Sequence, residues 1–567
     1  MQPMKIYGKI VNSMQKVFPC EEPAGEETKK EILQNERLNF QLVYKNDDSG
    51  TIAQAKIEAL GALAPYIQIR SVELVPATYL YRRSNDDYLL SDHPGLYPDI
   101  LKPLGTLGAV LPASQWKAFY VSIENKDGIA PGKYKTTFVL RSAEGAELST
   151  LQYTVTVLPV RARETDLKIT NWMHYDGIEA QHGVRLFSEE FYQVFEGYLR
   201  EYVRAGNTML FTPLFTPPLD TNIGGERRTA QLIGVKRHAG GAYEFDFSAL
   251  ERFVRFALSH GIKYIEFSHL FTQWGGKCCP KILAKTESGK TEKIFGWETA
   301  SDSKEYLAFL DAFLPQLIAV IDQNGWREIC YFHITDEPRI THLETYRFLL
   351  NHVKKYIGDM HVMDALSDYD FYEKGGVDIP VPLTSHFKSF EKKAIKELFV
   401  YYCCAPYNDY YSNRLLNMPL LRTKMIGTQL YETNVQGFLH WGFNFYNTAR
   451  SLEEIDPYVD TSAGSLFPAG DSFVVYPAKK NGAGAYGSLR SEALGEGFFE
   501  YRVLKTLEEY IGREKTVKIL HHFGIIGYNE YPRNDEKHNE LREKLYAALK
   551  RAKKTREEEK KERFYEQ

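Results

Sequence analysis

From residue 166 onward, short apolar segments alternate with amphipathic helical segments, and this alternation constrains the fold more than any other feature of the sequence. The spacing of apolar residues predicts eight strands, which begin near residues 167, 207, 261, 327, 360, 381, 397 and 437. Helical segments lie between most of them. Eight strand–helix units over roughly 280 residues are typical of a (β/α)8 TIM-like barrel. An open doubly wound sheet is the alternative, but no G-x-G-x-x-G motif follows the first strand.

The residues before this region are rich in strand signals. Apolar or alternating runs at 36–46, 116–125, 132–142 and 149–160 are separated by turn-forming residues. We therefore expect a multidomain α/β chain with an N-terminal β-sandwich over 1–165, a (β/α)8 barrel over 166–525 and a charged C-terminal helical tail over 526–567. A helix over 490–512 is expected to pack on the barrel. In the tail, the spacing of Leu541, Leu545 and Leu549 predicts one apolar stripe.

Charge and composition narrow the range of partners. A net charge of -4 over 567 residues favours neither nucleic acid nor an anionic membrane as partner. The sequence contains no stretch of about 18 apolar residues, so it predicts no membrane span. The six cysteines include two vicinal pairs and no C-x-x-C motif, and no signal peptide is recognisable, so we expect reduced thiols and a cytoplasmic location. The sequence does not indicate the oligomeric state.

Two adjacent acids follow the fourth predicted strand, in the segment HITDEP. In a TIM barrel the site lies where strands end, so Asp336 and Glu337 are placed for chemistry. Adjacent carboxylates repel each other, and one of them is expected to have a raised pKa. The alternative is a structural role, in which the acids favour the positive end of the following helix and Pro338 takes its first position.

The identity of the first acid indicates the substrate. Many barrel glycosidases carry Asn-Glu-Pro at this strand end and a second carboxylate on the seventh strand, whereas here the seventh strand ends YYCCAP without one. An Asp in the Asn position accepts hydrogen bonds and suits the N–H of a 2-acetamido group. The carbonyl oxygen of that group can attack C1, while Asp336 stabilises the developing positive charge. Glu337 would protonate the leaving oxygen and later deprotonate water.

The chain resembles glycoside hydrolase family 123 and proteins of the DUF4091 type. The resemblance is carried by HITDEP, FVYYCCAP, GFLHWGFNFYN, GDSFVVYP and SLRSEALGEGFFEYRVL, and it extends over most of residues 165–510. It implies a retaining β-N-acetylgalactosaminidase that uses an Asp-Glu pair and neighbouring-group participation, here Asp336 and Glu337. No cofactor is implied, and the expected partner is an oligosaccharide or glycoconjugate substrate. A substrate with another 2-acetamido hexose in place of GalNAc remains an alternative.

Further candidates for sugar binding lie at or after the strand ends. They are the aromatic and polar residues Trp172, His174, Trp274, Tyr402, Tyr407, Trp441, Asn444, Asp471 and Tyr476. The last two lie in a segment that resembles the family. Each has a structural alternative, such as a core aromatic ring or a satisfied buried histidine.

Two other functions remain open. A conventional two-carboxylate β-glycosidase would need a partner for Glu337, and Glu266 in the third predicted strand is the first candidate. A carbohydrate-binding protein without turnover would bind sugar even after loss of Glu337. No metal is expected, because no H-x-H or H-E-x-x-H motif occurs and the histidines are scattered.

Overall fold

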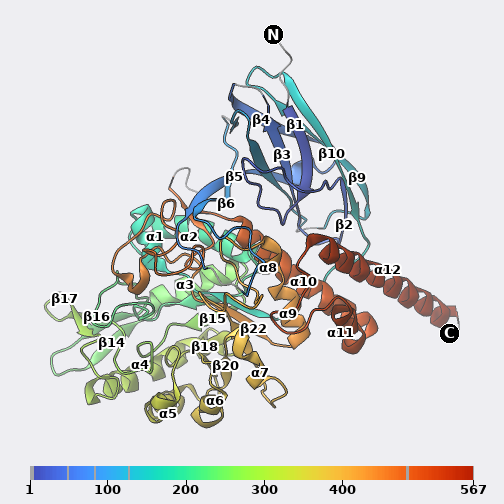
Figure 1. Cartoon of the computed structure of the whole chain (residues 1–567). Helices are drawn as coiled ribbons and strands as arrows, with labels where there is room; N and C mark the ends of the chain where they lie inside the picture. The colour runs from blue at the N-terminus through green and yellow to red at the C-terminus, as the bar shows by residue number, and fades with distance from the viewer. Residues whose placement is uncertain are drawn as a thin grey trace. The chain divides into compact units, whose positions relative to one another are not determined.

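The computed structural model describes residues 6–47, 50–81, 85–106, 108–125, 128–479 and 484–565. The chain divides into two compact units (Figure 1). The first comprises Met1–Thr165, Asn408–Thr433 and Tyr486–Gln567, and the second comprises Asp166–Tyr407 and Asn434–Ala485. The units therefore differ from the expected segments, because two stretches that we assigned to the barrel group with the N-terminal residues.

The predicted β-rich N-terminal region consists of two five-stranded sheets. One has the order β1 (Ile6–Asn12), β3 (Leu38–Asn46), β8 (Trp116–Ile123), β5 (Ile67–Ala77) and β6 (Gly95–Pro103). The other has the order β2 (Lys29–Ile32), β10 (Glu147–Val157), β9 (Gly132–Arg141), β4 (Ile52–Leu60) and β7 (Ala109–Leu111). Phe40 joins their inner faces, since its ring stacks on Tyr153 at 4.2 Å and meets Phe138 edge-on at 5.7 Å.

Five helices complete the first unit: α8 (Leu420–Lys424), α9 (Ile426–Thr433), α10 (Leu489–Ile511), α11 (Arg513–His522) and α12 (Asp535–Tyr565). Their apolar sides share one core, which includes Val503 and Leu507 of α10 and the predicted stripe of leucines on α12. The helix that we expected on the barrel thus belongs to this core. Gly427 and Gly497 let α9 and α10 approach closely, because a Cβ on Gly427 would lie 1.8 Å from the carbonyl oxygen of Gly497.

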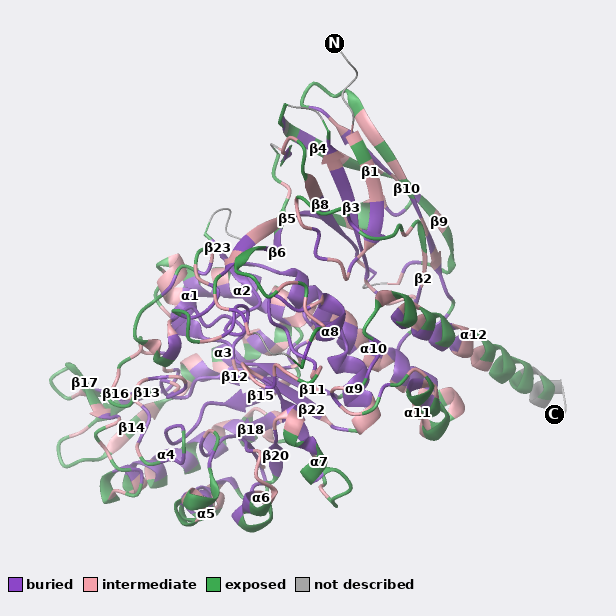
Figure 2. Ribbon diagram, viewed as in Figure 1, coloured by how far each residue is buried: buried purple, intermediate pink, exposed green. Residues whose placement is uncertain are grey.

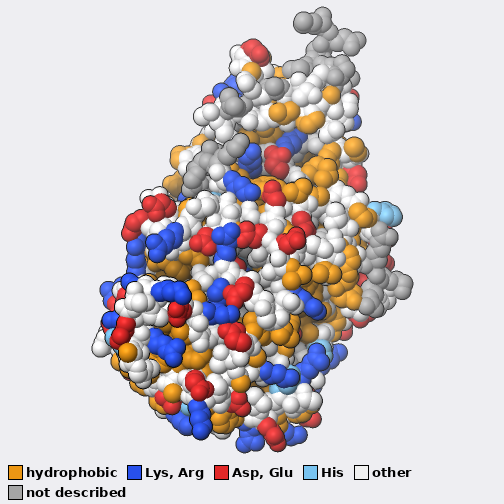
Figure 3. All heavy atoms as spheres, turned by 90° about the vertical axis from the view of Figure 1, so that its left-hand side faces the viewer, with side chains coloured by type: hydrophobic (Ala, Val, Ile, Leu, Met, Phe, Trp, Pro, Cys, Tyr) orange, Lys and Arg blue, Asp and Glu red, His pale blue; other side chains and the backbone are white. Residues whose placement is uncertain are grey.

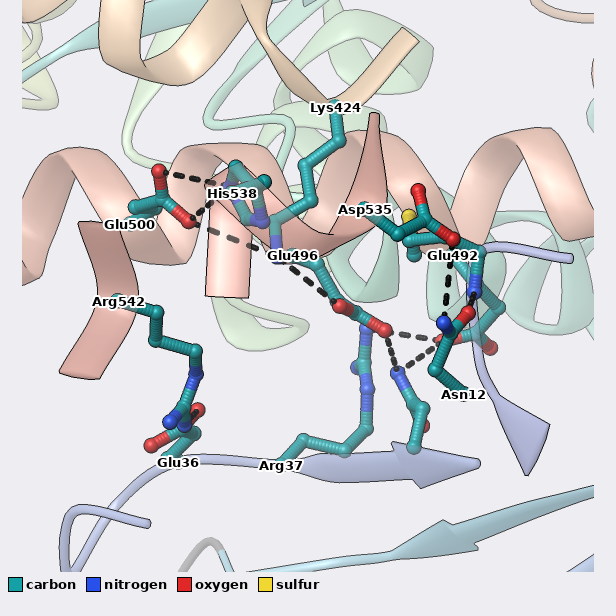
Figure 4. Close-up of polar contacts among 12 residues, drawn as sticks. Asn12, Glu36, Arg37, Lys424, Glu492, Glu496, Glu500, Asp535, His538 and Arg542 are labelled. Atoms are coloured by element: carbon teal, nitrogen blue, oxygen red, sulfur yellow. Dashed lines mark hydrogen bonds and ion pairs between the residues drawn. The ribbon is translucent and has the colours of Figure 1, made fainter. Parts of the chain in front are cut away.

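A row of three glutamates runs along α10, with the buried Glu492 and Glu500 and the partly exposed Glu496 spaced one turn apart (Figure 4). Their cationic partners come from three other parts of the unit: Arg37 and Arg70 at 3.1 and 2.7 Å from Glu492, Lys424 at 3.4 and 3.5 Å from Glu496 and Glu500, and His538 at 3.2 Å from Glu500. We name these three side chains the α10 glutamate row. The row ties the β-sheets, α8 and α12 to one face of α10.

The α10 glutamate row predicts acid lability. Burial alone would raise the pKa of Glu500, but the charges of His538 and Lys424 outweigh it and lower that pKa. For Glu496, burial is likewise outweighed, by Lys424 and Lys30, and the pKa is lowered. The stabilisation is therefore complete above the ordinary carboxyl range, about pH 4.5, and is lost as the pH falls towards the folded-state values.

We expect the denaturant midpoint of the first unit to fall steeply below about pH 4.5. Midpoints measured on the full chain between pH 3 and 7 test this, and Glu500→Gln should give a shallower dependence because it removes one of the titrating groups. A midpoint that is unchanged over that range contradicts the assignment.

The second unit contains the predicted barrel. Its eight parallel strands have the order β20 (Ile379–Val381), β19 (His361–Ala365), β18 (Cys330–Phe332), β15 (Tyr264–Phe267), β12 (Met209–Thr212), β11 (Lys168–Asn171), β22 (Gly437–His440) and β21 (Phe399–Tyr401). The Tyr401 amide donates to the carbonyl oxygen of Pro382 at 3.0 Å, which brings the two ends of the sheet together into a nearly closed barrel. All eight strands lie where the sequence predicts them.

Helices follow the barrel strands: α1 (Tyr175–His182), α2 (Glu189–Arg204), α3 (Ser248–Ser259), α4 (Lys304–Gln323), α5 (Leu343–Ile357), α6 (Tyr369–Gly375) and α7 (Phe387–Phe390). Ser188 and Ser303 cap α2 and α4 through their hydroxyl oxygens. The loops carry a four-stranded sheet of β14 (Tyr243–Asp246), β13 (Gly234–Arg237), β16 (Ile282–Thr286) and β17 (Thr291–Phe295), and a pair of β23 (Tyr476–Ala478) with β24 (Gly484–Tyr486).

The barrel strands are buried, whereas the outer sides of α5 and α6 are exposed (Figure 2). Charged side chains of both signs are interspersed on the face drawn in Figure 3, which therefore offers no extended area of one charge to a polyanion. No helix among the described residues is long and apolar enough to cross a membrane.

Candidate active site

The predicted acid pair lies where β18 ends. Asp336 is partly exposed and Glu337 is exposed. Glu337 has φ of 44°, in the left-handed region that side chains other than glycine rarely adopt. The amide of Trp274 donates to the backbone oxygen of Asp336 at 2.8 Å and helps to hold this turn. Such a conformation costs about 1–3 kcal/mol and persists only where the surroundings fix it, which is common at functional sites.

Tyr401, the last residue of β21, contacts the pair from across the barrel. Its hydroxyl donates to Oε1 of Glu337 at 2.5 Å. Burial, and then the nearby Glu337 carboxylate, raise the pKa of Tyr401 well above its usual range. The phenol therefore stays protonated and remains a donor to Glu337 at any working pH.

We expect Tyr401→Phe to lower kcat about 10–100-fold with little change in KM, because a hydrogen bond to a charged group contributes about 1.5–3 kcal/mol. Steady-state kinetics on the best substrate measure this. Tyr402→Phe is the matched control, since Tyr402 is the next residue in the chain and its ring packs against Phe438. Equal losses in the two variants would contradict the role of Tyr401.

The first acid of the pair holds its proton more tightly than an ordinary aspartate does. Burial, and then the charge of Glu337, raise the pKa of Asp336 well above its usual range, while His333 opposes the rise. Because the carboxyl groups are adjacent, ionising both is unfavourable. A ligand that donates a hydrogen bond to one acid would leave the proton on the other.

A buried ion cluster lies beneath the pair. The His333 ring is 2.6 Å from Oε1 of Glu266 and 3.1 Å from Oδ1 of Asp364, and all three side chains are fully buried. Glu266 also accepts from Nε1 of Trp172 at 2.7 Å and from the hydroxyl of Thr170. The carboxylate that we considered as a second catalytic acid is thus enclosed and occupied by three donors.

The aromatic wall of the site is formed by Trp441, which follows β22 and is half-buried. Its indole N–H donates to Asp471 at 3.1 Å, and its backbone oxygen accepts from Nε2 of His174 at 2.9 Å. Trp441 shares an apolar cluster with Trp172 and Tyr401. The indole is therefore held at both its ring and its backbone, as a fixed surface beside the acids.

His174 is neutral and acts as a bridge. Arg227, whose side chain is 6% exposed, donates to Nδ1 of His174 at 3.1 Å, so that nitrogen is an acceptor and Nε2 carries the hydrogen. Burial, and then the charge of Arg227, lower the pKa of His174 to about 4. Arg227 is itself paired with Asp176 at 2.8 Å. This chain of contacts fixes the position of Trp441.

Comparison with known proteins identifies the family. The family profile described as glycoside hydrolase 123, catalytic domain, matches residues 172–507, which is more than half of the chain. The chain belongs to glycoside hydrolase family 123. The family predicted from the sequence is thereby confirmed, and the chain is a glycoside hydrolase.

A solved structure from the same family agrees with this chain at the level of fold. A family 123 glycoside hydrolase from Clostridium perfringens is 17% identical, with a TM-score of 0.72, and the match covers 98% of this chain and 99% of that chain. An endo-β-1,4-mannanase from Thermotoga petrophila is 13% identical, with a TM-score of 0.34, and the match covers 60% of this chain and 77% of that chain. A search of curated proteins found no match.

Four other residues that the sequence predicts at the site of this family 123 enzyme are buried and in contact with neighbouring protein groups. Tyr402 and Tyr476 are fully buried, and they pack against the rings of Phe438 and Phe473, respectively. The amide of Asn444 exchanges hydrogen bonds with the backbone of His174 at 2.8 and 2.9 Å. Trp172 is 3% exposed and bound to Glu266. These contacts lie within the packed structure around the site, and the predicted roles of the four residues in sugar binding stay predictions.

Trp274 and Tyr407, which are also predicted to bind sugar, are not fully buried. Trp274 is 40% exposed, has φ of 60° and is tied through its backbone to Asp336. Tyr407 is half-buried in the loop after β21. Both stay predictions for sugar binding.

His269, His333 and Asp364 offer ligand atoms that lie within 4.8 Å of one another. A metal ion would need a free ring nitrogen on His333. Both of its nitrogens already face carboxylate oxygens, so the donor set does not suit a metal. We assign no metal to this cluster.

Proposed function

We propose that the enzyme releases a β-linked 2-acetamido sugar, with GalNAc favoured, by a retaining and substrate-assisted mechanism. The observation that carries the proposal is the adjacent pair of Asp336 and Glu337 after β18, while Glu266 is enclosed by its own donors. A 2-acetamido N–H donates to Asp336 and so favours its ionised form. Glu337 then acts as the acid that protonates the leaving oxygen.

The reaction proceeds in two steps. The acetamido oxygen attacks C1 as the bond from C1 to the leaving oxygen breaks, and Glu337 gives its proton to that oxygen. Asp336 stabilises the positive charge of the oxazolinium ion. Water then attacks C1 and gives a proton to Glu337, and the oxazolinium ring opens. Two inversions at C1 retain the β configuration.

The family and the site both support a proposal for the substrate class. The Clostridium perfringens relative is described for glycolipid glycan hydrolysis. We propose a glycan of the same kind here, with Trp441 packing against the apolar face of the sugar and Trp274 and Tyr407 at the rim.

Aryl β-glycosides of GalNAc, GlcNAc, galactose and glucose test the proposal with the wild-type chain. We expect turnover of an N-acetyl sugar only. Equal turnover of galactose or glucose would overturn the substrate-assisted mechanism. It would direct attention to Asp220, a partly exposed carboxylate close enough to raise the pKa of Asp336.

A further inference from the structure

The first unit contains a groove of about 960 Å³ between the strands β2, β10 and β9 on one side and helix α12 on the other. The strands line it mainly with lysine, threonine and glutamine side chains, and Asn539, Glu543 and Lys550 are among the residues that line it from α12. Pockets of about 300–1,000 Å³ hold molecules of drug size rather than single ions. None of the residues that line the groove belongs to the candidate active site.

The strands present a polar face to the groove. Val155 of β10 lies in the sandwich core, so alternation along the strand places Thr154 and Thr156 on the opposite, outer face. Thr154 lies opposite Lys29 of β2 on one side and opposite Lys135 of β9 on the other. Because neighbouring strands are about 4.8 Å apart, the Cα atoms of the two lysines lie roughly 10 Å from each other.

Three lysines of this face, Lys29, Lys133 and Lys135, are exposed, and none of them forms an ion pair with a residue that the structure describes. Lys133 precedes Lys135 by two residues in β9 and lies opposite Thr156, so it shares the same face. Like charges at neighbouring positions of a sheet destabilise it. A bound anion would offset that repulsion, so the groove favours a negatively charged ligand.

The acidic residues of the groove do not neutralise these three lysines. Glu27 pairs with Lys30 at 3.4 Å, and Glu31 pairs with Lys550 at 2.8 Å. Glu543 of α12 is exposed and is the remaining acid of the described lining. The groove therefore keeps an excess of positive charge, although the whole chain carries a net charge of -4.

The groove is formed before any ligand binds, because side-chain contacts hold α12 beside β2. Arg542 donates to Glu36 at 2.6 Å, a pair drawn in Figure 4, and to the backbone oxygen of Glu31 at 2.9 Å. The hydroxyl of Tyr546, one turn further along α12, donates to the other oxygen of Glu36 at 2.6 Å. Binding in a preformed groove costs little ordering of the protein.

We propose that this groove binds an acidic oligosaccharide, whose carboxylate or sulfate groups meet Lys29, Lys133 and Lys135. Ammonium groups form strong, charge-assisted hydrogen bonds with anionic oxygens. The hydroxyls of Thr154 and Thr156 can donate to sugar hydroxyls or accept from them. The chain is a glycoside hydrolase, so glycans are the molecules that it encounters. Binding in the groove does not depend on which sugar the acid pair releases.

Two other anionic partners fit the groove less well. A lipid bilayer presents a flat surface, whereas these lysines line a groove with a helix along one side. Nucleic acid presents a regular row of phosphates and is bound by many cations, whereas here three lysines share the lining with Glu27, Glu31 and Glu543. A short acidic glycan needs neither a flat nor a long basic surface.

Calorimetric titration of the full chain with three sugars tests the proposal. Sialyllactose carries a carboxylate, sulfated lactose carries a sulfate, and lactose is neutral. We expect at least one of the acidic sugars to bind about tenfold or more tightly than lactose. The groove variant combines Lys29→Gln, Lys133→Gln and Lys135→Gln. It should lower that affinity about tenfold or more, because the amides keep donors but lose the charge.

The matched control variant combines Lys56→Gln, Lys102→Gln and Lys544→Gln. These lysines are exposed, lie in the same unit on β4, β6 and α12, and do not line the groove. The control changes the net charge by the same amount, so its affinity for the acidic sugar should equal that of the wild type. Thermal midpoints check the fold of both variants. If the groove variant does not fold, Lys135→Gln alone decides.

Four results would overturn the proposal. They are the absence of binding by both acidic sugars, equal affinity for lactose, equal losses in the groove and control variants, and inorganic sulfate binding as tightly as sulfated lactose. Binding to vesicles that contain phosphatidylserine, without binding to either acidic sugar, would assign the groove to a membrane surface instead. The titration reads no turnover, so a failure of the proposed function leaves its result intact.

Discussion

Glu337→Gln should lower kcat by about 100–10,000-fold, the usual contribution of a general acid–base. The loss should depend on the leaving group, because a good leaving group needs no protonation. With a dinitrophenyl glycoside, the rate of the first step in Glu337→Gln should return towards that of the wild type. With an oligosaccharide substrate, the variant should show the full loss. Asp336→Asn should lose about 100–1,000-fold with every leaving group, since it removes stabilisation of positive charge rather than a proton. Steady-state kinetics on both substrate types measure the contrast.

The same two variants provide their own folding control. Asp336 and Glu337 are adjacent carboxyl groups, and Asp336 is partly buried, so removing one charge relieves repulsion. We expect thermal midpoints equal to or slightly above that of the wild type. A fall of several degrees would mean that the loss of activity reflects unfolding. Identical leaving-group dependence in both variants would contradict the assigned division of roles.

Lys424→Met should destabilise the first unit by about 3–5 kcal/mol, because it leaves a buried and a partly exposed glutamate without their shared cation. The Lys424 side chain is 8% exposed and lies between Glu496 and Glu500. Denaturant unfolding of the full chain at pH 7 measures the change. The loss should shrink in the triple variant that also carries Glu496→Gln and Glu500→Gln, since the uncompensated charges are then gone.

Lys554→Met is the matched control for this prediction. Lys554 pairs with Glu558 on α12, and their side chains are 78% and 59% exposed. We expect a change below about 0.5 kcal/mol. Similar effects of the two substitutions would show that burial does not set the strength of the α10 glutamate row.

The barrel could be predicted from the sequence because its signal is local. Each strand is a short apolar run and each helix an amphipathic one, so all eight strands were placed to within a few residues. The grouping of residues 408–433 and 486–525 could not be predicted in the same way. Helix α10 looks like any helix that could cover a barrel, and its true partners on α9 and α12 are distant or follow it in the chain.

The acids of the site carried a local signal, whereas the residues that hold them did not. Tyr401 is the last residue of β21 and Tyr402 follows it, and the first contacts Glu337 whereas the second packs against Phe438. In a strand of only three residues, the sequence pattern is too short to tell which side chains face the acids. Asp364, an acid inside an apolar strand, did carry a signal for a function. Arg227 lies in a long loop, and nothing near it in the sequence marks it.

The chain passes between its two compact units four times, at residues 165, 407, 433 and 485. Segments that complete the core of the first unit are thus encoded within and after the loops of the barrel. Cutting the gene after residue 165 would strip the β-sheets of α8, α9 and α10 and expose their shared apolar core. The β-region could therefore not have been transferred alone to an unrelated barrel during evolution. The two units must be inherited, synthesised and folded as one piece.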